Sequence, residues 1–428
     1  MSLNVLIVGS GAREHAFAWK LVRSPRVGKL YVAPGNGGTC QIAENIPISA
    51  TDIDGLLRFT KKNAIDLTLV GPEESLALGI VDVFRAEGLQ IFGPTRAAAE
   101  IETSKAFAKE LMSRAGVPTA PFRIFRKYDE ALAHVREHGA PLVIKASGPA
   151  LGKGAYPCET LVEAENALTE IVINRTHGEA GNEVVVEEFL GGQEISIHAF
   201  SDGKTSILLP PAQDHKPRHE GDKGKNTGGM GTIAPVPWVT TKTLREINEG
   251  IVRPTLGALA ELGRPFTGLL YPGLKMTPNG PKVLEFNARW GDPETQSYMR
   301  LLKTDLLDVL EACVHGTLAD LKIEWRSGFA VCVVLVSSGY PGEYKKGLPI
   351  WGIAEAESIP GVVVFHAGTR FVGNEFVTSG GRVLGVSSVS DTLHDALDRA
   401  YQAAEIIQFE GKDYRKDIGA KALTLSKS

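Results

Sequence analysis

The segment KVLEFNARWGDPETQ, residues 282–296, combines acidic, amide and basic side chains at a spacing that suits metal binding. In a β-strand, alternate side chains lie on the same face. Glu285 and Asn287 are therefore expected to project together. Their apolar neighbours, Leu284 and Phe286, are expected to face the core. A carboxylate and an amide oxygen two residues apart suit a hard cation that bridges nucleotide phosphates.

Arg289 and a polar turn extend this segment. If the strand continues, Arg289 lies on the same face, and its guanidinium fork matches a carboxylate or a phosphate. Asp292, Glu294 and Gln296 follow in the turn. The alternative is an exposed edge strand with a solvated face, which the bordering apolar residues disfavour. We expect a metal ion and an anionic ligand to meet here.

A glycine-rich stretch, IKASGPALGKGA, resembles a phosphate-binding loop without matching one. A Walker A loop reads G-x-x-x-x-G-K-[ST]. Only three residues separate Gly148 from Gly152, and after Lys153 the residue Gly154 replaces the metal-binding hydroxyl. Three interpretations are open: a damaged P-loop, a turn with no ligand, or a different way of holding ATP.

Two apolar strands run into charged residues beside this loop. Lys145 ends the strand LVIK, and its position before the glycines favours a phosphate contact over a solvent-exposed ammonium. The strand EVVVEE runs into Glu187, then Phe189, Leu190 and, after two glycines, Glu194. A linker between two lobes that meets an adenine, with a carboxylate for ribose hydroxyls, explains this pattern. A plain hinge is the alternative.

The first glycines depart from a dinucleotide-binding fingerprint. The segment GSGAREH follows an apolar strand and opens a helix, as that fingerprint does. The sixth position holds Glu14 in place of Gly or Ala, which argues against a bound dinucleotide. Backbone N–H groups at the helix start still favour a phosphate. Gly9, Gly11 and Arg13 therefore belong either to a substrate-phosphate site or to a ligand-free turn.

Residues 214–231, DHKPRHEGDKGKNTGGMG, form a polar, glycine-rich segment that is too long for a simple hairpin. Such segments are usually functional or disordered. Its glycines, with Asn226 and Thr227 near Met230, indicate a backbone that closely approaches a ligand. A mobile surface loop is the alternative.

Composition indicates a multidomain globular protein. The chain has 428 residues, of which 43% are hydrophobic and 22% charged, enough for three or four domains. A net charge of −4 gives no electrostatic case for nucleic-acid or membrane partners. The four scattered cysteines favour a reducing compartment. We expect no transmembrane helix, no targeting peptide and a cytoplasmic location.

Four successive regions are predicted. Residues 1–102 alternate apolar strands with helices, as in a doubly wound parallel α/β sheet. Residues 103–190 form a small α+β lobe with a leading helix, and residues 191–325 a larger lobe. Residues 326–428 form a β-rich C-terminal α+β domain. The expected antiparallel strands of the larger lobe are QEISIHAF, SILLP, TGLLYPGLKM and KVLEFN.

Taken together, the motifs resemble the ATP-grasp superfamily and, within it, the glycinamide ribonucleotide synthetase family. The resemblance spans nearly the whole chain, and NTGGMG with FNARWGDPETQ is its most specific pair. It implies an α/β multidomain protein with an ATP-grasp fold of two α+β lobes. A doubly wound domain precedes these lobes and a β-rich domain follows them. Other segments that carry it are VAPGNGGT, DLTLVGPEESL, GPTRAAAEIETSKAFAKELM, VVEEFLGGQEIS, SSGYPGEYKKG and FHAGT.

The resemblance also implies roles for individual residues. The metal, Mg²⁺ or Mn²⁺, is expected at Glu285 and Asn287, and the catalytic residues are expected to be Arg289, Lys145 and Asp292. The expected ATP-binding residues are Lys105, Lys145, Gly148, Gly152, Lys153, Gly154, Glu187, Phe189, Leu190 and Glu194. The expected substrate-binding residues are Gly9, Gly11, Arg13, Asp214, Lys216, Asn226, Thr227, Gly228, Gly229, Met230, Arg289, Pro293 and Glu294.

The implied reaction joins glycine to 5-phosphoribosylamine, an early step of purine biosynthesis. Glycine carboxylate attacks the γ-phosphate of ATP, and the amine then attacks the resulting glycyl phosphate. Because the first step brings two anions together, metal and lysines must neutralise charge. The expected partners are these small molecules, with the chain acting as a monomer or weak homodimer.

The chain departs from the family pattern at a few positions, and rival functions stay open. Ser147 stands where the family usually has Asp, and Pro149 lies inside the glycine-rich loop. Ala288 and Trp290 replace a common Cys and Phe. The rivals are another ATP-grasp carboxylate–amine ligase or carboxylase, a dinucleotide-dependent oxidoreductase, and a catalytically inactive binding protein.

Overall fold

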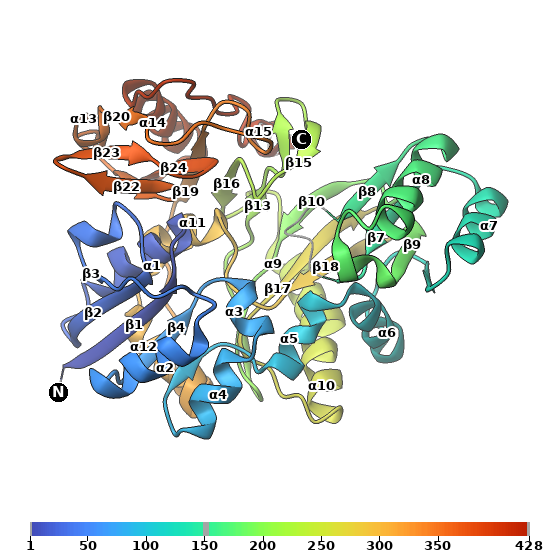
Figure 1. The fold of residues 1–428 in the computed structure, drawn as a ribbon, viewed down its shortest axis with the longest axis horizontal. Helices are drawn as coiled ribbons and strands as arrows, with labels where there is room; N and C mark the ends of the chain where they lie inside the picture. The colour runs from blue at the N-terminus through green and yellow to red at the C-terminus, as the bar shows by residue number, and fades with distance from the viewer. Residues whose placement is uncertain (1, 149–153, 426–428) are drawn as a thin grey trace.

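The computed structural model describes residues 2–148 and 154–425. The N-terminal residues form a doubly wound parallel sheet in the order β3-β2-β1-β4-β5, drawn in blue in Figure 1. This confirms the predicted architecture of the first region. Its strands are β1 (Leu3–Gly9), β2 (Val27–Pro34), β3 (Glu44–Asn45), β4 (Leu67–Val70) and β5 (Ile91–Phe92), and its helices are α1 (Ala12–Leu21), α2 (Ile53–Lys62), α3 (Glu73–Ala77) and α4 (Ile80–Ala86).

Two helices lead into the small lobe. Helix α5 (Arg96–Thr103) is followed directly by α6 (Lys105–Ala115). The Ser104 side chain caps α6 by accepting a hydrogen bond from the N–H of Phe107 at 3.1 Å. Gly116, with φ of 66°, ends the helix in a left-handed conformation that glycine adopts without strain.

The small lobe is an antiparallel sheet in the order β6-β9-β7-β8 with helices on its outer side. It lies to the right in Figure 1. Apolar residues of its strands and helices form their own buried cluster, so the lobe has a separate core. Its elements are β6 (Phe122–Phe125), α7 (Tyr128–His138), β7 (Leu142–Ala146), β8 (Ala155–Cys158), α8 (Leu161–Leu168) and β9 (Val184–Glu188).

The larger lobe contains an antiparallel sheet in the order β10-β17-β11-β12, with β18 also pairing with β17. The segment QEISIHAF, predicted as one strand, forms two, which pair with successive stretches of the long strand β17 and are separated at Ile197 and His198. The strands are β10 (Gln193–Ser196), β11 (Ala199–Asp202), β12 (Ser206–Leu208), β17 (Thr267–Thr277) and β18 (Gly280–Asn287). The helices are α9 (Thr241–Ile247), α10 (Arg253–Glu261), α11 (Glu294–Leu301) and α12 (Leu306–His315).

A bulge in β18 makes the prediction for Leu284 wrong. On β17, Gly273 pairs with Glu285 and Leu274 pairs with Val283, so Leu284 has no opposite residue. One inserted residue reverses the alternation of side chains on its N-terminal side. Val283 is therefore fully buried and Leu284 only half-buried.

The C-terminal sheet, in the order β13-β16-β19-β24-β21, includes strands from before residue 326. Strand β16 (Gly231–Ala234) pairs with β13 (Gln213–Asp214) and with β19 (Phe329–Val336). Between β13 and β16, the segment expected to be a loop contains the hairpin of β14 (Pro217–His219) and β15 (Lys223–Asn226). The other C-terminal elements are β20 (Pro349–Ile350), α13 (Ile353–Glu357), β21 (Val362–His366), β22 (Thr369–Val372), β23 (Glu375–Thr378), β24 (Arg382–Ser390), α14 (Leu393–Ile406) and α15 (Ala420–Leu425). Across residues 2–148 and 154–425, no helix combines the length and apolarity needed to cross a bilayer.

Candidate active site

A buried carboxylate lies between two lysines on the inner side of the small lobe. Glu187 of β9 forms ion pairs with Lys145 of β7 and Lys109 of α6. The three residues are only 3%, 5% and 2% exposed, respectively. Burial lowers the pKa of Lys109 to about 8, against the opposing effect of Glu187. Charges removed from water need such partners, so the three side chains fix one another.

The same lysines connect the small lobe to the bulge of β18. Lys145 Nζ donates a hydrogen bond to the carbonyl oxygen of Leu284 at 2.9 Å. Lys109 Nζ donates to Thr119 Oγ1 at 2.6 Å, and Thr119 Oγ1 donates to the carbonyl oxygen of Val283 at 2.7 Å. Hydrogen bonds from the small-lobe side therefore fix the carbonyl groups of both Val283 and Leu284.

Glu285 and Asn287 lie beyond the bulge with a donor set that fits a hard divalent cation. Lys216 Nζ lies 2.9 Å from Glu285 Oε1. The charge of Lys216, aided by Lys105 and Lys145, holds the pKa of Glu285 well below its usual range despite burial. Glu285 is therefore ionised, and its carboxylate and the Asn287 amide offer two oxygen donors. This pair fits Mg²⁺ or Mn²⁺.

Arg289 contacts two acidic residues that sequence reasoning did not single out. Its Nε lies 3.3 Å from Glu73 Oε2 and 3.2 Å from Glu102 Oε1, and its Nη2 donates to Asn287 Oδ1 at 3.3 Å. Arg289 lowers the pKa of Glu73 to about 2, whereas burial raises the pKa of Glu102. Glu73 of α3 and Glu102 of α5 therefore orient the guanidinium together.

The C-terminal domain supplies Arg382, which joins two predicted substrate segments. Its Nη1 donates to the carbonyl oxygen of Asp292 at 2.8 Å and to that of Gly228, and its Nη2 lies 3.4 Å from Asp292 Oδ2. Burial opposes ionisation of Asp292, but Arg382 and Arg13 outweigh it and lower its pKa. Gln296 Nε2 donates to Asp292 Oδ1 at 2.7 Å. The turn after β18 is therefore fixed from several sides.

Glu14 occupies the turn that leads into α1. Its Oε2 accepts a hydrogen bond from the backbone N–H of Gly11 at 2.5 Å, and its Oε1 lies 2.6 Å from Arg13 Nε. A Cβ atom on Gly71 would lie 1.8 Å from this carboxylate, and one on Gly9 would lie 2.6 Å from its Cδ atom. Gly9 and Gly71, at the ends of β1 and β4, therefore leave room for the Glu14 carboxylate. This carboxylate already accepts the hydrogen bond of the Gly11 N–H.

The segment around NTGGMG folds back on Lys216. Thr227 Oγ1 donates to the carbonyl oxygen of Lys216 at 2.8 Å and accepts from the N–H of Gly229 at 3.0 Å. Asp214 Oδ1 is buried with no hydrogen-bond partner among the described residues, and burial raises the pKa of Asp214. Met230 is fully buried among apolar residues of the C-terminal sheet, so its side chain is part of a core.

Glu294 faces a polar cluster behind the turn. Its Oε1 accepts a hydrogen bond from Ser196 Oγ at 2.9 Å, and Ser196 Oγ lies 2.9 Å from Tyr271 Oη. Pro293 packs close to the NTGGMG segment, since a Cβ atom on Gly229 would lie 2.4 Å from its Cδ atom. Asn226, the first residue of that segment, lies at the end of β15.

The residues expected around adenine and ribose lie along the connection between the lobes. Phe189 is 39% exposed and Leu190 is buried. Glu194 Oε1 is 3.2 Å from Lys275 Nζ and lines a narrow pocket with Asp214 and Lys216. The side chain of Glu187, in contrast, is enclosed by its two lysines, and its backbone lies in the central strand β9, which pairs with both β6 and β7.

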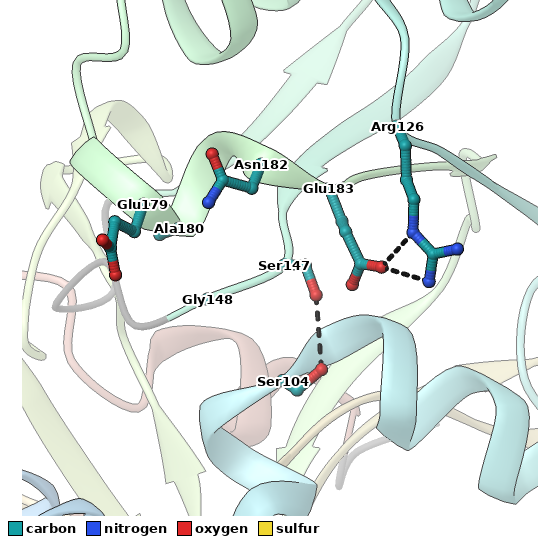
Figure 2. A pocket seen from close by; sticks show the side chains of 8 residues that line it. All are labelled: Ser104, Arg126, Ser147, Gly148, Glu179, Ala180, Asn182 and Glu183. Atoms are coloured by element: carbon teal, nitrogen blue, oxygen red, sulfur yellow. Dashed lines mark hydrogen bonds and ion pairs between the residues drawn. The ribbon is translucent and has the colours of Figure 1, made fainter.

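Beside Gly148, a cavity of about 390 Å³ opens at the edge of the small lobe. Figure 2 shows Ser147 and Ser104 pointing toward one another, with their Oγ atoms 3.4 Å apart. Ser147 Oγ also accepts from the N–H of Ala106 at 3.0 Å, and Lys105 N donates to the Ser147 carbonyl oxygen at 2.7 Å. Burial lowers the pKa of Lys105 despite Glu285. The cavity is lined by Ser104, Arg126, Ser147, Gly148, Glu179, Ala180, Asn182 and Glu183.

Several expected loop residues lie outside the described part of the chain. Gly152, Lys153 and Pro149 are among them. Gly154 is described, and its carbonyl oxygen accepts a hydrogen bond from the N–H of Ala146 at 2.8 Å.

Two lobes built on antiparallel sheets, with Lys145 and Lys216 contacting Leu284 and Glu285 of β18, are the arrangement of an ATP-grasp ligase. The same fold is found in the biotin carboxylase–β,γ-ATP complex of Campylobacter jejuni, with a TM-score of 0.74 over 100% of this chain and 96% of that one. At 15% identity, this likeness concerns the fold alone.

The chain belongs to the phosphoribosylglycinamide synthetase family. The family's N domain matches residues 3–102, its ATP-grasp (A) domain residues 103–295 and its C domain residues 330–421. The phosphoribosylamine–glycine ligases of Caldanaerobacter subterraneus subsp. tengcongensis and Chlorobaculum tepidum are each 49% identical over 98% of this chain and 100% of their own. The crystal structure of the Thermotoga maritima phosphoribosylamine–glycine ligase has a TM-score of 0.84 and 33% identity, over 97% of this chain and 100% of that one.

We predict that Lys109→Met destabilises the protein by about 3 kcal/mol, because removing one partner leaves buried charge uncompensated. Urea denaturation measures the change. The control is Lys127→Met, since Lys127 forms an exposed pair with Glu130 and its loss should leave the midpoint unchanged. A Lys109 effect no larger than the control's would contradict a structural role for the buried ion pairs.

We also predict that Gly71→Ala lowers the free energy of unfolding by about 2 kcal/mol, because its Cβ atom would collide with Glu14. Gly257→Ala is the matched control. It lies inside α10 with no atom within 4 Å of an added Cβ, and should stabilise the protein by about 1 kcal/mol. Equal effects of the two substitutions would refute the tight packing around Glu14.

Proposed function

We propose that this chain catalyses the reaction after which its phosphoribosylamine–glycine ligase relatives are named. ATP drives the joining of glycine to 5-phosphoribosylamine, giving glycinamide ribonucleotide, ADP and phosphate, an early step of purine biosynthesis. The single observation that carries the residue assignments is the convergence on β18 and its following turn. There Lys145 of the small lobe contacts the carbonyl oxygen of Leu284, and Lys216 of the larger lobe pairs with Glu285. Arg289 contacts Asn287, and Arg382 of the C-terminal domain pairs with Asp292.

Charge neutralisation is the main task of the first step. The glycine carboxylate attacks the γ-phosphate, so a carboxylate and a polyphosphate must approach each other. Lys105 and Lys145 counter the phosphate charge, since fixed cations in a dry site stabilise a developing anion strongly. Glu285 and Asn287 would hold Mg²⁺ or Mn²⁺, which would supply positive charge against the phosphates.

The nucleotide lies between the two lobes. The loop from Gly148 to Gly154 is assigned to the phosphates, and Glu187, Phe189 and Leu190 frame the adenine. Glu194 accepts hydrogen bonds from the ribose hydroxyls. Support comes from the exposure of Phe189 and from the pocket that Glu194 lines with Asp214 and Lys216.

Arg289 binds the carboxylate of glycine, helped by the turn at Asp292, Pro293 and Glu294. Glu73 and Glu102 orient the guanidinium for this contact. The fixed turn beside it supports a role for Asp292 in positioning the reacting groups.

Phosphoribosylamine lies across the N-terminal turn and the NTGGMG segment. Because Glu14 already uses the N–H of Gly11, Arg13 supplies the cation at this turn. Met230 contributes backbone only, since its side chain is buried. The proposed set is Gly9, Gly11, Arg13, Asp214, Lys216, Asn226, Thr227, Gly228, Gly229 and Met230.

In the second step the amine of phosphoribosylamine attacks the acyl carbon of glycyl phosphate, and the C–O bond to phosphate breaks as the amide forms. Acyl phosphates hydrolyse in water, so a closed site protects the intermediate. The expected assembly is a monomer or a weak homodimer.

A coupled assay tests the reaction. ADP release should require glycine, 5-phosphoribosylamine, ATP and Mg²⁺ together, with glycinamide ribonucleotide as the product detected by mass spectrometry. Equal turnover with formate or bicarbonate in place of glycine would instead favour another ATP-grasp ligase or carboxylase.

Glu285→Ala should lower kcat by at least about 100-fold, because it removes a metal ligand and leaves Lys216 without its closest carboxylate. The Mg²⁺ concentration for half-maximal activity should also rise. Steady-state kinetics with varied Mg²⁺ measure both effects. Glu246→Ala, in an exposed pair with Lys242, is the control and should behave like the unmodified chain. A near-normal kcat for Glu285→Ala would refute the proposal that Glu285 is a metal ligand.

A further inference from the structure

The last turn of helix α7 presents two imidazoles and a carboxylate on one face. His134, Glu137 and His138 are spaced i, i+3 and i+4, so their side chains lie over adjacent turns of the helix. The ligand atoms that they offer all lie within 4.8 Å of one another. The two imidazole rings have centroids 3.9 Å apart.

Neighbouring groups restrict both rings. His138 Nδ1 lies 3.0 Å from the carbonyl oxygen of His134, a hydrogen bond that leaves Nε2 with its lone pair. His134 packs against Phe125 of β6, with ring centroids 5.1 Å apart, and is half-buried. Burial and the neighbouring His138 lower the pKa of the His134 imidazole.

We propose that His134, Glu137 and His138 bind a late first-row divalent metal ion such as Zn²⁺, Ni²⁺ or Cu²⁺. Two imidazole nitrogens with one carboxylate are the donors that these ions prefer over Mg²⁺ or Ca²⁺. Two histidines at i and i+4 on one helix face are a known arrangement for such ions. Three protein ligands leave positions open for water or for a further group.

The position of the site on the helix favours a cation. Helix α7 ends at His138, and Gly139 follows with φ of 74°. The negative end of the helix dipole is at this last turn, where a positive charge is stabilising. A metal ion that bridges residues four apart also fixes that turn. Figure 1 shows α7 at the outer edge of the small lobe, away from β17 and β18, so this site is separate from the oxygen ligands of β18.

Calorimetric titration of Ni²⁺ into the full chain tests the proposal, with excess Mg²⁺ present to occupy oxygen-ligand sites. The chain should bind one Ni²⁺. His138→Ala should weaken binding by about 10-fold or more, since even the loss of an outer-sphere partner commonly costs that much. His138 is exposed, so this variant should fold, and Glu137→Ala should show a smaller loss.

Two controls keep the result decisive. His394 of α14 is exposed and pairs with Asp398 at i and i+4 with a 3.4 Å contact, but that pair offers a single imidazole, so His394→Ala should leave binding unchanged. Cys40 is an exposed thiol, and Cys40→Ser should also leave it unchanged. Unchanged binding in His138→Ala, loss in Cys40→Ser, or no stoichiometric binding to the unmodified chain would overturn the proposal. Neither the ATP site nor the ligase reaction enters this test.

Discussion

The buried ion pairs of Glu187 are the interaction on which the geometry of the catalytic cleft depends. One carboxylate satisfies two ammonium groups that come from different elements, the strand β7 and the helix α6. Lys145 donates a hydrogen bond directly to the bulge of β18, and Lys109 is connected to it through the hydroxyl of Thr119. Glu285 and Asn287, the proposed metal ligands, follow immediately after that bulge. A polar contact on the small-lobe side thus helps to position the proposed metal-binding face of the larger lobe.

Electrostatic compensation within the chain recurs across the site. Glu285 faces Lys216, Arg289 faces two acids, and Asp292 faces Arg382. These pairs draw on the N-terminal domain, the larger lobe and the C-terminal domain. Because each pair is partly or wholly buried, misplacing one partner leaves a costly unpaired charge. These charge pairs therefore also fix the positions of the domains relative to one another.

Part of this arrangement follows from sequence patterns. The parallel sheet, the antiparallel lobes and the shared face of Glu285 and Asn287 follow from strand periodicity and turn residues. The bulge could not be predicted, because an extra residue in β18 is recognisable only from its pairing with β17. The bulge moves Leu284 out of the core.

Long-range partners were also missed. Glu73 follows the Gly-Pro pair at the carboxyl end of β4, where ligand-binding residues concentrate in parallel sheets, so a local signal existed for it. Glu102, Lys109 and Arg382 had none. Their importance comes from contacts with residues far away in sequence, and helix or strand periodicity does not encode such contacts.

The pairing of β16 with β19 bears on how the protein is made. The NTGGMG segment leads directly into β16, and β16 completes its sheet only with strands that leave the ribosome after the whole larger lobe. Pairing across such a long stretch of chain is slow to form because its loop-closure entropy must be lost first. During synthesis the lobe therefore emerges with an uncovered strand edge, a surface open to aggregation until the C-terminal sheet arrives. A shortened chain that stops before β19 would retain that edge permanently.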